Sequence, residues 1–380
     1  MIKSIFLYGI FLAIFTIFTY FFVDPNLIYF KTFYSGFALK ERGVVSLIYI
    51  LLILIFFVFY YFLYSRVTIK NLKKIILISV IFLFFSYPAV LSYDIFNYIT
   101  TAKVTYFYLE NPYIIYPIEF IGEPYLEFTR AANKTALYGP FWIMLSGIPF
   151  ISGFGNFILT LFNFKLLSFS FYLGISYLIF KLTKDPKKVA FFALNPLVLI
   201  ETVVSGHNDV VMMFFALFSL YFLKKNKYAF SVIFMVFSIL IKLATVFLTP
   251  VFIYYFYMKL KKKRIDWDKI FMLSATSMLA IFFLSPLREE IYPWYGIWFL
   301  TFAALIPKYK ILRVFSVLLS FVLLLRYIPF MYLGTYFGPT PGIKILVTFI
   351  PIAVLIIAYL IIRKERLVKI LKRHEFNFKI

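Results

Sequence analysis

Apolar stretches near the length of a membrane-crossing helix follow one another along most of this chain, and they constrain its fold more than any other feature. They lie at about 3–23, 44–64, 74–92, 165–182, 188–204, 208–223, 228–242, 244–258, 269–286, 294–307, 311–328 and 343–362. Hydrophobic residues make up 63% of the sequence and charged residues 14%, far outside the range of soluble domains. The sequence therefore predicts an all-α polytopic transmembrane helical bundle with about 12 spans.

The distribution of charge predicts how the bundle is oriented. Lys and Arg number 39 and Asp and Glu 16, a net charge of +23 that could suggest nucleic-acid binding. With the N-terminus inside, 28 basic and 5 acidic residues fall in inner segments, which then carry the whole excess, as the positive-inside rule requires. This charge balance requires that residues 139–152 do not cross the membrane, so we expect a short helix there in the outer leaflet. Both termini are expected in the cytoplasm, and no nucleic-acid partner is expected.

One integral-membrane domain, 1–380, is expected, with two parts outside the bilayer. Residues 93–164 should form a large extracytoplasmic loop with juxtamembrane helices, because 93–137 is too polar to span and loops of this length are usually functional. The basic stretch 363–380 is expected to be a cytoplasmic tail. The first apolar stretch lacks a small-x-small cleavage site and is expected to be a retained helix. The chain has no cysteine, which excludes disulfides and thiolate chemistry.

Two acidic residues lie at positions that the distribution of charge across the membrane does not explain. Asp94 directly follows the third span in the segment Ser92-Tyr93-Asp94-Ile95-Phe96-Asn97-Tyr98, although an acid at a helix end can simply mark the interface. Glu201 lies within the 188–204 span, three to four residues below the outer surface. A carboxylate at that depth costs about 2–3 kcal/mol unless it has a partner or faces a wet cavity. A functional role is therefore the default expectation for Glu201.

Other polar residues gather at outer helix ends. Gly206-His207-Asn208-Asp209 forms a tight turn between two spans, and a turn does not require His207, one of only two histidines. Lys242 interrupts an apolar hairpin, where it could extend to headgroups or bind an anion. Arg288 opens a loop with Trp294 and Tyr295, residues that also suit an aromatic belt. The inner face supplies mainly lysines and arginines, so we expect the chemistry on the extracytoplasmic face.

Motifs for other chemistries are absent or weak. The sequence has no GxxxxGK loop, GxGxxG, HExxH or GxSxG, which argues against ATP-driven pumping, zinc proteolysis and ordinary serine hydrolysis. His207 with Asp94, Glu201 and Asp209 could hold a divalent cation, because one imidazole plus carboxylates suits Mn²⁺, Mg²⁺ or Zn²⁺. The spacing gives no ligand signature. No cofactor is therefore assigned, and a weak site at Asp94, His207 and Asp209 stays an alternative.

At these residues the chain resembles the multispanning glycosyltransferases of the GT-C superfamily, particularly the polyprenol-phosphate-mannose-dependent mannosyltransferases. The resemblance covers about residues 90 to 300 and depends on short segments in a fixed order. These are Tyr93-Asp94-Ile95-Phe96-Asn97-Tyr98, Asn111-Pro112-Tyr113 with Pro117, Tyr138-Gly139-Pro140-Phe141-Trp142, Asn195-Pro196-Leu197 with Glu201, Gly206-His207-Asn208-Asp209, Lys242 with Pro250, and Pro293-Trp294-Tyr295 with Trp298. Many relatives carry a soluble C-terminal domain; none is expected here, so acceptor recognition is expected to depend on the loops.

The resemblance implies a membrane glycosyltransferase that moves a sugar, mannose or another hexose, from a polyprenyl-phosphate carrier to an extracytoplasmic glycan, glycolipid or protein, with inversion. It implies that Asp94 is the general base. Lys242 and Arg288 are the candidates for binding the donor phosphate, since cations stabilise a leaving group that gains negative charge. The candidates for binding sugar or acceptor are Asn97, Tyr98, Asn111, Tyr113, Tyr138, Glu201, His207, Asn208, Asp209, Trp294 and Tyr295. The expected location is the cell membrane, with the active site on its extracytoplasmic face.

Two other classes compete with this interpretation. A transporter or flippase of a lipid-linked sugar would show the same outer aromatic residues, but it would also be expected to have ionisable residues near mid-membrane and commonly inverted repeats. Glu201 is the only deep acid, and no internal repeat is visible. A membrane scaffold without catalysis would leave Asp94 and Glu201 without a purpose.

Overall fold

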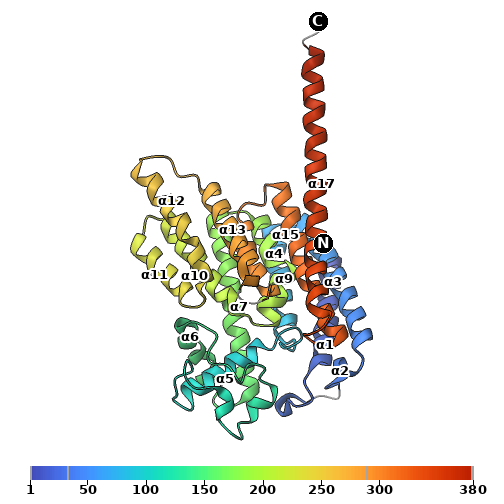
Figure 1. Ribbon diagram of the computed structural model, residues 1–380, viewed down its shortest axis with the longest axis vertical. Coiled ribbons are helices and arrows are strands. Elements are labelled where there is room, and N and C mark those ends of the chain that lie inside the picture. The colour runs from blue at the N-terminus through green and yellow to red at the C-terminus, as the bar shows by residue number, and fades with distance from the viewer. Residues whose placement is uncertain (1, 32–33, 288–289, 378–380) are drawn as a thin grey trace.

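The computed structural model of the chain describes residues 2–31, 34–287 and 290–377, and side chains as far as residue 362. Every regular element in these ranges is helical, which confirms the expected all-α class. The N-terminal part contains α1 (Ile2–Thr19), the short α2 (Phe37–Lys40), α3 (Arg42–Ser65) and α4 (Ile69–Phe84). In Figure 1 these helices stand beside α15 (Lys310–Leu325) and α17 (Thr340–Asn377), so the two ends of the chain lie on one flank of the molecule.

Seven helical segments are long and apolar enough to cross a membrane, judged by length and composition among the described residues. They are Ile2–Phe22, Arg42–Ser65, Phe157–Thr183, Leu243–Leu260, Trp267–Leu287, Lys310–Leu333 and Thr340–Ile362. A bent pair, Pro196–Val204 and Asp209–Lys224, would make eight if it counts as one span. The chain is thus a multi-pass membrane protein, but the expected count of about 12 spans is not confirmed.

The difference arises because several expected spans form short or broken helices. Helix α4 has 16 residues, α11 (Tyr228–Ile239) has 12 and α14 (Gly296–Ala303) has 8. At 1.5 Å per residue, a helix of 12 residues rises only about 18 Å, against a hydrocarbon core of about 30 Å. The apolar stretch 188–204 is also divided, because Pro196 starts a new helix after α8 (Pro186–Ala193).

The segment between α4 and α7 (Phe157–Thr183) folds into short helices rather than a disordered loop. It contains α5 (Asp94–Tyr106), two 3₁₀ turns at Pro117–Glu119 and Pro124–Phe128, and α6 (Pro140–Ile151). The helix expected at 139–152 is therefore present as α6. In Figure 1, α5 and α6 lie at the end of the molecule opposite the free end of α17.

The centre of the bundle is formed by helices with almost no exposed surface. All eight residues of α14 are buried, as are all residues of α9 (Pro196–Leu199) and most of α10 (Asp209–Lys224). The helices α12 (Thr249–Leu260), α13 (Trp267–Leu284) and α16 (Ile328–Leu333) complete the bundle. The polar ends of α9, α10 and α14 therefore meet inside the protein, next to the start of α5.

Candidate active site

A sharp break between α9 and α10 creates the centre of the site. Asn195 caps α9 by accepting a hydrogen bond from the backbone nitrogen of Leu197, at 3.0 Å. The chain then forms a π-helical turn over Ile200–Val204 and bends by 112° before α10 begins at Asp209. Gly206 has a φ of +71°, in the left-handed region that glycine adopts without strain. Single π turns within helices are frequent at functional sites, and this one carries Glu201, with His207 and Asp209 just beyond it.

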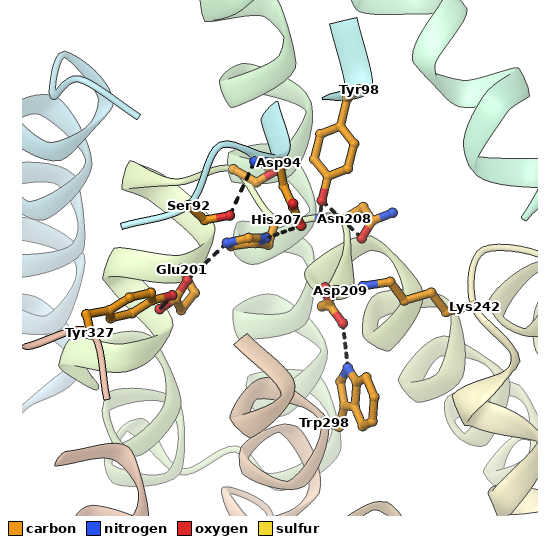
Figure 2. A network of polar contacts seen from close by, with 12 residues as sticks. Ser92, Asp94, Tyr98, Glu201, His207, Asn208, Asp209, Lys242, Trp298 and Tyr327 are labelled. Atoms are coloured by element: carbon orange, nitrogen blue, oxygen red, sulfur yellow. Dashed lines mark hydrogen bonds and ion pairs between the residues drawn. The ribbon is translucent and has the colours of Figure 1, made fainter. Parts of the chain in front are cut away.

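His207 lies between two carboxylates, as Figure 2 shows. Its Nδ1 is 3.5 Å from Oδ2 of Asp94, and its Nε2 is 3.2 Å from Oε2 of Glu201. These are ion-pair contacts and not aligned hydrogen bonds. His207 and Glu201 are fully buried, whereas the side chain of Asp94 is 26% exposed. An imidazole between two acids is stabilised in its charged form, so it offsets part of their negative charge.

Glu201 has the partners that a buried carboxylate needs. Besides its contact with His207, it accepts a hydrogen bond from the hydroxyl of Tyr327, at 3.0 Å. The ring of Trp294 stacks on the imidazole of His207, with centroids 4.0 Å apart and planes 18° from parallel. Glu201 therefore contacts both His207 and Tyr327, and its place among the candidate site residues stays a prediction.

A second acidic centre lies on the other side of the break. Asp209, at the first residue of α10, is fully buried, and its Oδ2 is 2.7 Å from Nζ of Lys242. Its Oδ1 accepts a hydrogen bond from Nε1 of Trp298, at 2.6 Å. Tyr295 stacks on Trp298 with centroids 4.1 Å apart and also lies 5.6 Å from the Lys242 ammonium. Lys242 therefore points into the protein, where it neutralises Asp209, instead of extending to headgroups.

The start of α5 places Asp94 against this cluster. Asp94 is the first residue of the helix, a favourable place for a negative charge, and its backbone nitrogen donates to Oγ of Ser92 at 3.2 Å. Tyr98 lies one turn further on and points in the same direction. Its hydroxyl donates to Oδ1 of Asn208 and accepts from the Asn208 backbone nitrogen, both at 3.3 Å (Figure 2). Tyr98 thereby fixes α5 on the turn that carries His207.

The structure brings together most, but not all, of the residues expected from sequence. Tyr138 packs edge-on against Tyr98, with ring centroids 4.8 Å apart. Asn97 accepts a hydrogen bond from the backbone of Ala131, and Asn111 from that of Tyr113, so both amides stabilise the loop. Tyr113 donates to the carbonyl of Tyr138 and is likewise part of the loop framework. Arg288 lies outside the described residues.

Two aromatic residues that contact the buried acids were not among the expected site residues. Trp298 was noted only as part of a motif, and its indole donates to Asp209. Tyr327 follows α15 and reaches Glu201, 126 residues earlier in the sequence. A tyrosine at a helix end resembles any interfacial aromatic residue, so no local signal marks it.

The alternative cation site is not assembled. Among residues 2–31, 34–287 and 290–362, whose side chains the structure describes, no group of three or more His, Asp or Glu side chains is arranged to hold a metal ion. Asp209 contacts Lys242 and Trp298 instead of joining Asp94 and His207. The three residues thus belong to two separate centres.

The chain is thus a helical multi-pass membrane protein that buries a cluster of acids, a histidine and stacked aromatic rings at its helix ends. Comparison with protein families matches residues 26–258 to the family described as "Alpha-(1->6)-mannopyranosyltransferase, N-terminal domain", and the chain belongs to this family, since more than half of its residues match. It is therefore a glycosyltransferase, a mannosyltransferase of the GT-C superfamily. No curated protein and no solved structure was found to match.

Proposed function

We propose that the enzyme transfers mannose from a polyprenyl-phosphate carrier to a hydroxyl of an extracytoplasmic glycan, glycolipid or protein, with Asp94 as the general base. One observation carries the assignment of the base. Of the three acids in the two centres, Asp94 has a 26% exposed side chain, whereas Glu201 and Asp209 are fully buried and bound to partners. Asp94 is thus the acid that an acceptor can reach.

The reaction is a single displacement at the anomeric carbon of the sugar. The acceptor oxygen forms a bond to this carbon while the bond to the carrier phosphate oxygen breaks, which inverts the configuration. The acceptor proton moves to the carboxylate of Asp94, and polyprenyl phosphate leaves. His207 orients Asp94 from 3.5 Å, and Glu201 and Trp294 hold His207 in place.

Lys242 and Arg288 remain the proposed cations for the donor phosphate. The ammonium of Lys242 has three N–H donors and contacts one carboxylate, that of Asp209, so it has donors left for a phosphate oxygen. Tyr295 stacks on Trp298 and is proposed to pack on the sugar, whereas the buried ring of Trp294 stacks on both His207 and Tyr292 and is proposed to hold His207 in place. Tyr98, Tyr138 and Asn208 lie beside the same centre and remain candidates for contacts with sugar or acceptor. The proposed face for the reaction is the extracytoplasmic one, to which we also assign α5 and α6.

The test is a transfer assay on the purified protein in lipid, with radiolabelled polyprenyl-phosphate sugars as donors. Asp94→Asn keeps the size of the side chain and should lower turnover by at least ~100-fold, the usual scale for loss of a general base. Glu127→Gln is the matched control, because Glu127 is an exposed acid of the same loop. Retention of turnover within a few-fold in Asp94→Asn would refute this role, and Asp209 and Glu201 would be tested next.

A further inference from the structure

A cavity of about 410 Å³ lies beside the site, between the N-terminal helices and α16. Most of its wall is apolar, with contributions from Phe21, Val23, Leu39, Val90, Phe330 and Met331. Its volume falls in the usual range for small-molecule sites. Because apolar residues from four separate segments converge on it, the cavity suits a hydrocarbon chain.

Two arginines line this apolar cavity, and one of them is paired with an acid. Arg130 is paired with the buried Asp24 at 3.1 Å and lies over the ring of Tyr93, 4.6 Å from its centroid. Arg42 also lines the cavity, and in the described part of the chain no carboxylate lies within ion-pair distance of its guanidinium. Among the residues that the structure describes, the wall thus carries one cation, Arg42, without an acidic partner. A guanidinium is well suited to bind a phosphate or carboxylate through two N–H groups.

The guanidinium of Arg42 packs closely against Gly334 at the cavity wall. A Cβ at Gly334 would lie 2.4 Å from Cζ of Arg42. Gly334 also has a φ of +73°, in the left-handed region that favours glycine. The cation therefore lies against the backbone that follows α16.

Two residues that line the cavity connect it to the candidate active site. Tyr93 lines it and immediately precedes Asp94. Tyr327 lines it as well, and the hydroxyl of Tyr327 donates to Glu201. A ligand in the cavity would therefore lie one residue from the proposed base and in contact with the residue that holds Glu201.

We propose that this cavity binds an anionic lipid, with its acidic headgroup at Arg42 and the start of its chain along the apolar wall. The role of this lipid as a substrate rests on the proposed function. The same chemistry is offered by two sources, a polyprenyl-phosphate donor and an acidic glycolipid acceptor. An acceptor in the cavity leaves Lys242 to the donor phosphate, whereas a donor in the cavity would have its phosphate at Arg42 in place of Lys242.

Binding is tested separately from turnover. The purified protein in phosphatidylcholine nanodiscs is titrated with undecaprenyl phosphate, and with undecaprenol as the uncharged equivalent, by native mass spectrometry. Arg42→Gln should weaken binding of the phosphate about tenfold or more, the scale of one charge-assisted contact. Ala38→Phe, which fills the apolar part of the cavity, should weaken binding of the polyprenyl chain. Lys40→Gln, an exposed cation two residues from Arg42 that does not line the cavity, should have no effect.

The transfer assay then distinguishes the two sources. A raised KM for the donor alone in Arg42→Gln assigns the cavity to the donor, and a raised KM for the acceptor alone assigns it to the acceptor. Undiminished binding of undecaprenyl phosphate by both Arg42→Gln and Ala38→Phe overturns the proposal. Failure of the proposed function would appear differently, as transfer retained by Asp94→Asn while lipid binding still depends on Arg42.

Discussion

Lys242 and Asp209, which lie 33 residues apart in the sequence, meet with 2.7 Å between the ammonium nitrogen and Oδ2 of the carboxylate. The carboxylate is fully buried and the side chain of Lys242 is 19% exposed. A buried acid that loses its cation is costly. The ion pair therefore stabilises the contact between the start of α10 and the segment after α11. It also places a cation in the site. A change at Lys242 should therefore affect both stability and donor use.

We predict that Lys242→Gln destabilises the protein by on the order of 3 kcal/mol, because it leaves Asp209 buried with Trp298 as its remaining partner. The double variant Lys242→Gln, Asp209→Asn removes the unpaired charge and should recover much of this loss. Thermal unfolding of both variants in detergent measures the effect. Equal stability of wild type and Lys242→Gln would contradict a structural role for the ion pair.

Kinetics separate this structural role from donor binding. If Lys242 also binds the donor phosphate, Lys242→Gln should lower kcat/KM for the donor about ten- to a hundredfold, and the double variant should not restore it. Lys242→Arg should restore activity only in part, since a planar fork replaces a compact charge. An unchanged donor KM and kcat in Lys242→Gln would place the phosphate elsewhere, and the cavity at Arg42 would then be the first alternative.

For the other centre, we predict that His207→Gln lowers kcat about ten- to a hundredfold with little change in KM, because Asp94 loses its orienting contact while the substrate walls remain. Glu201→Gln combined with His207→Gln should fold better than His207→Gln alone, since it removes a buried carboxylate that has lost its cation. Steady-state kinetics and thermal unfolding measure the two effects. A selective rise in KM would instead assign His207 to substrate binding.

The site could be predicted largely from sequence because its residues interrupt apolar segments. Glu201, His207 and Lys242 stand out against hydrophobic neighbours, and the structure places them at helix ends around one break in the chain. Their pairing could not be predicted, since it depends on the 112° break between α9 and α10. Tyr327 and Arg42 gave no signal either, because aromatic and basic residues at helix ends are common in any membrane protein.

The number of spans could not be predicted for a different reason. Hydropathy identifies apolar segments, but it does not show where a proline such as Pro196 starts a new helix or where helices such as α11 end early. Buried short helices such as α14 are as apolar as true spans. The sequence pattern therefore predicts the class of fold better than the path of each helix.

The long loop offers a prediction on pH. Burial by itself raises the pKa of Glu123, but hydrogen bonds from Lys103, Tyr108 and the backbone of Tyr125 outweigh it and hold the pKa below its usual value. The carboxylate therefore stabilises the fold at neutral pH, and this contribution is lost as the pH falls below the ordinary range of a glutamate. Wild type should unfold at a higher temperature than Glu123→Gln near pH 7, and the difference should shrink in acid. A difference that does not depend on pH would contradict this origin.

The orientation of the chain is tested by labelling single cysteines introduced into this cysteine-free sequence. Ile121 is 99% exposed in the loop between α5 and α6, and Lys263 is exposed between α12 and α13, so Ile121→Cys and Lys263→Cys should leave the fold intact. Glu123 is a poorer position, because its ion pair with Lys103 would be lost. In intact cells an impermeant thiol reagent should label Ile121→Cys directly and Lys263→Cys only after permeabilisation, because the positive charge of the inner segments orients the bundle. The reverse pattern would place α5, and with it Asp94, on the cytoplasmic face and would exclude an extracytoplasmic reaction.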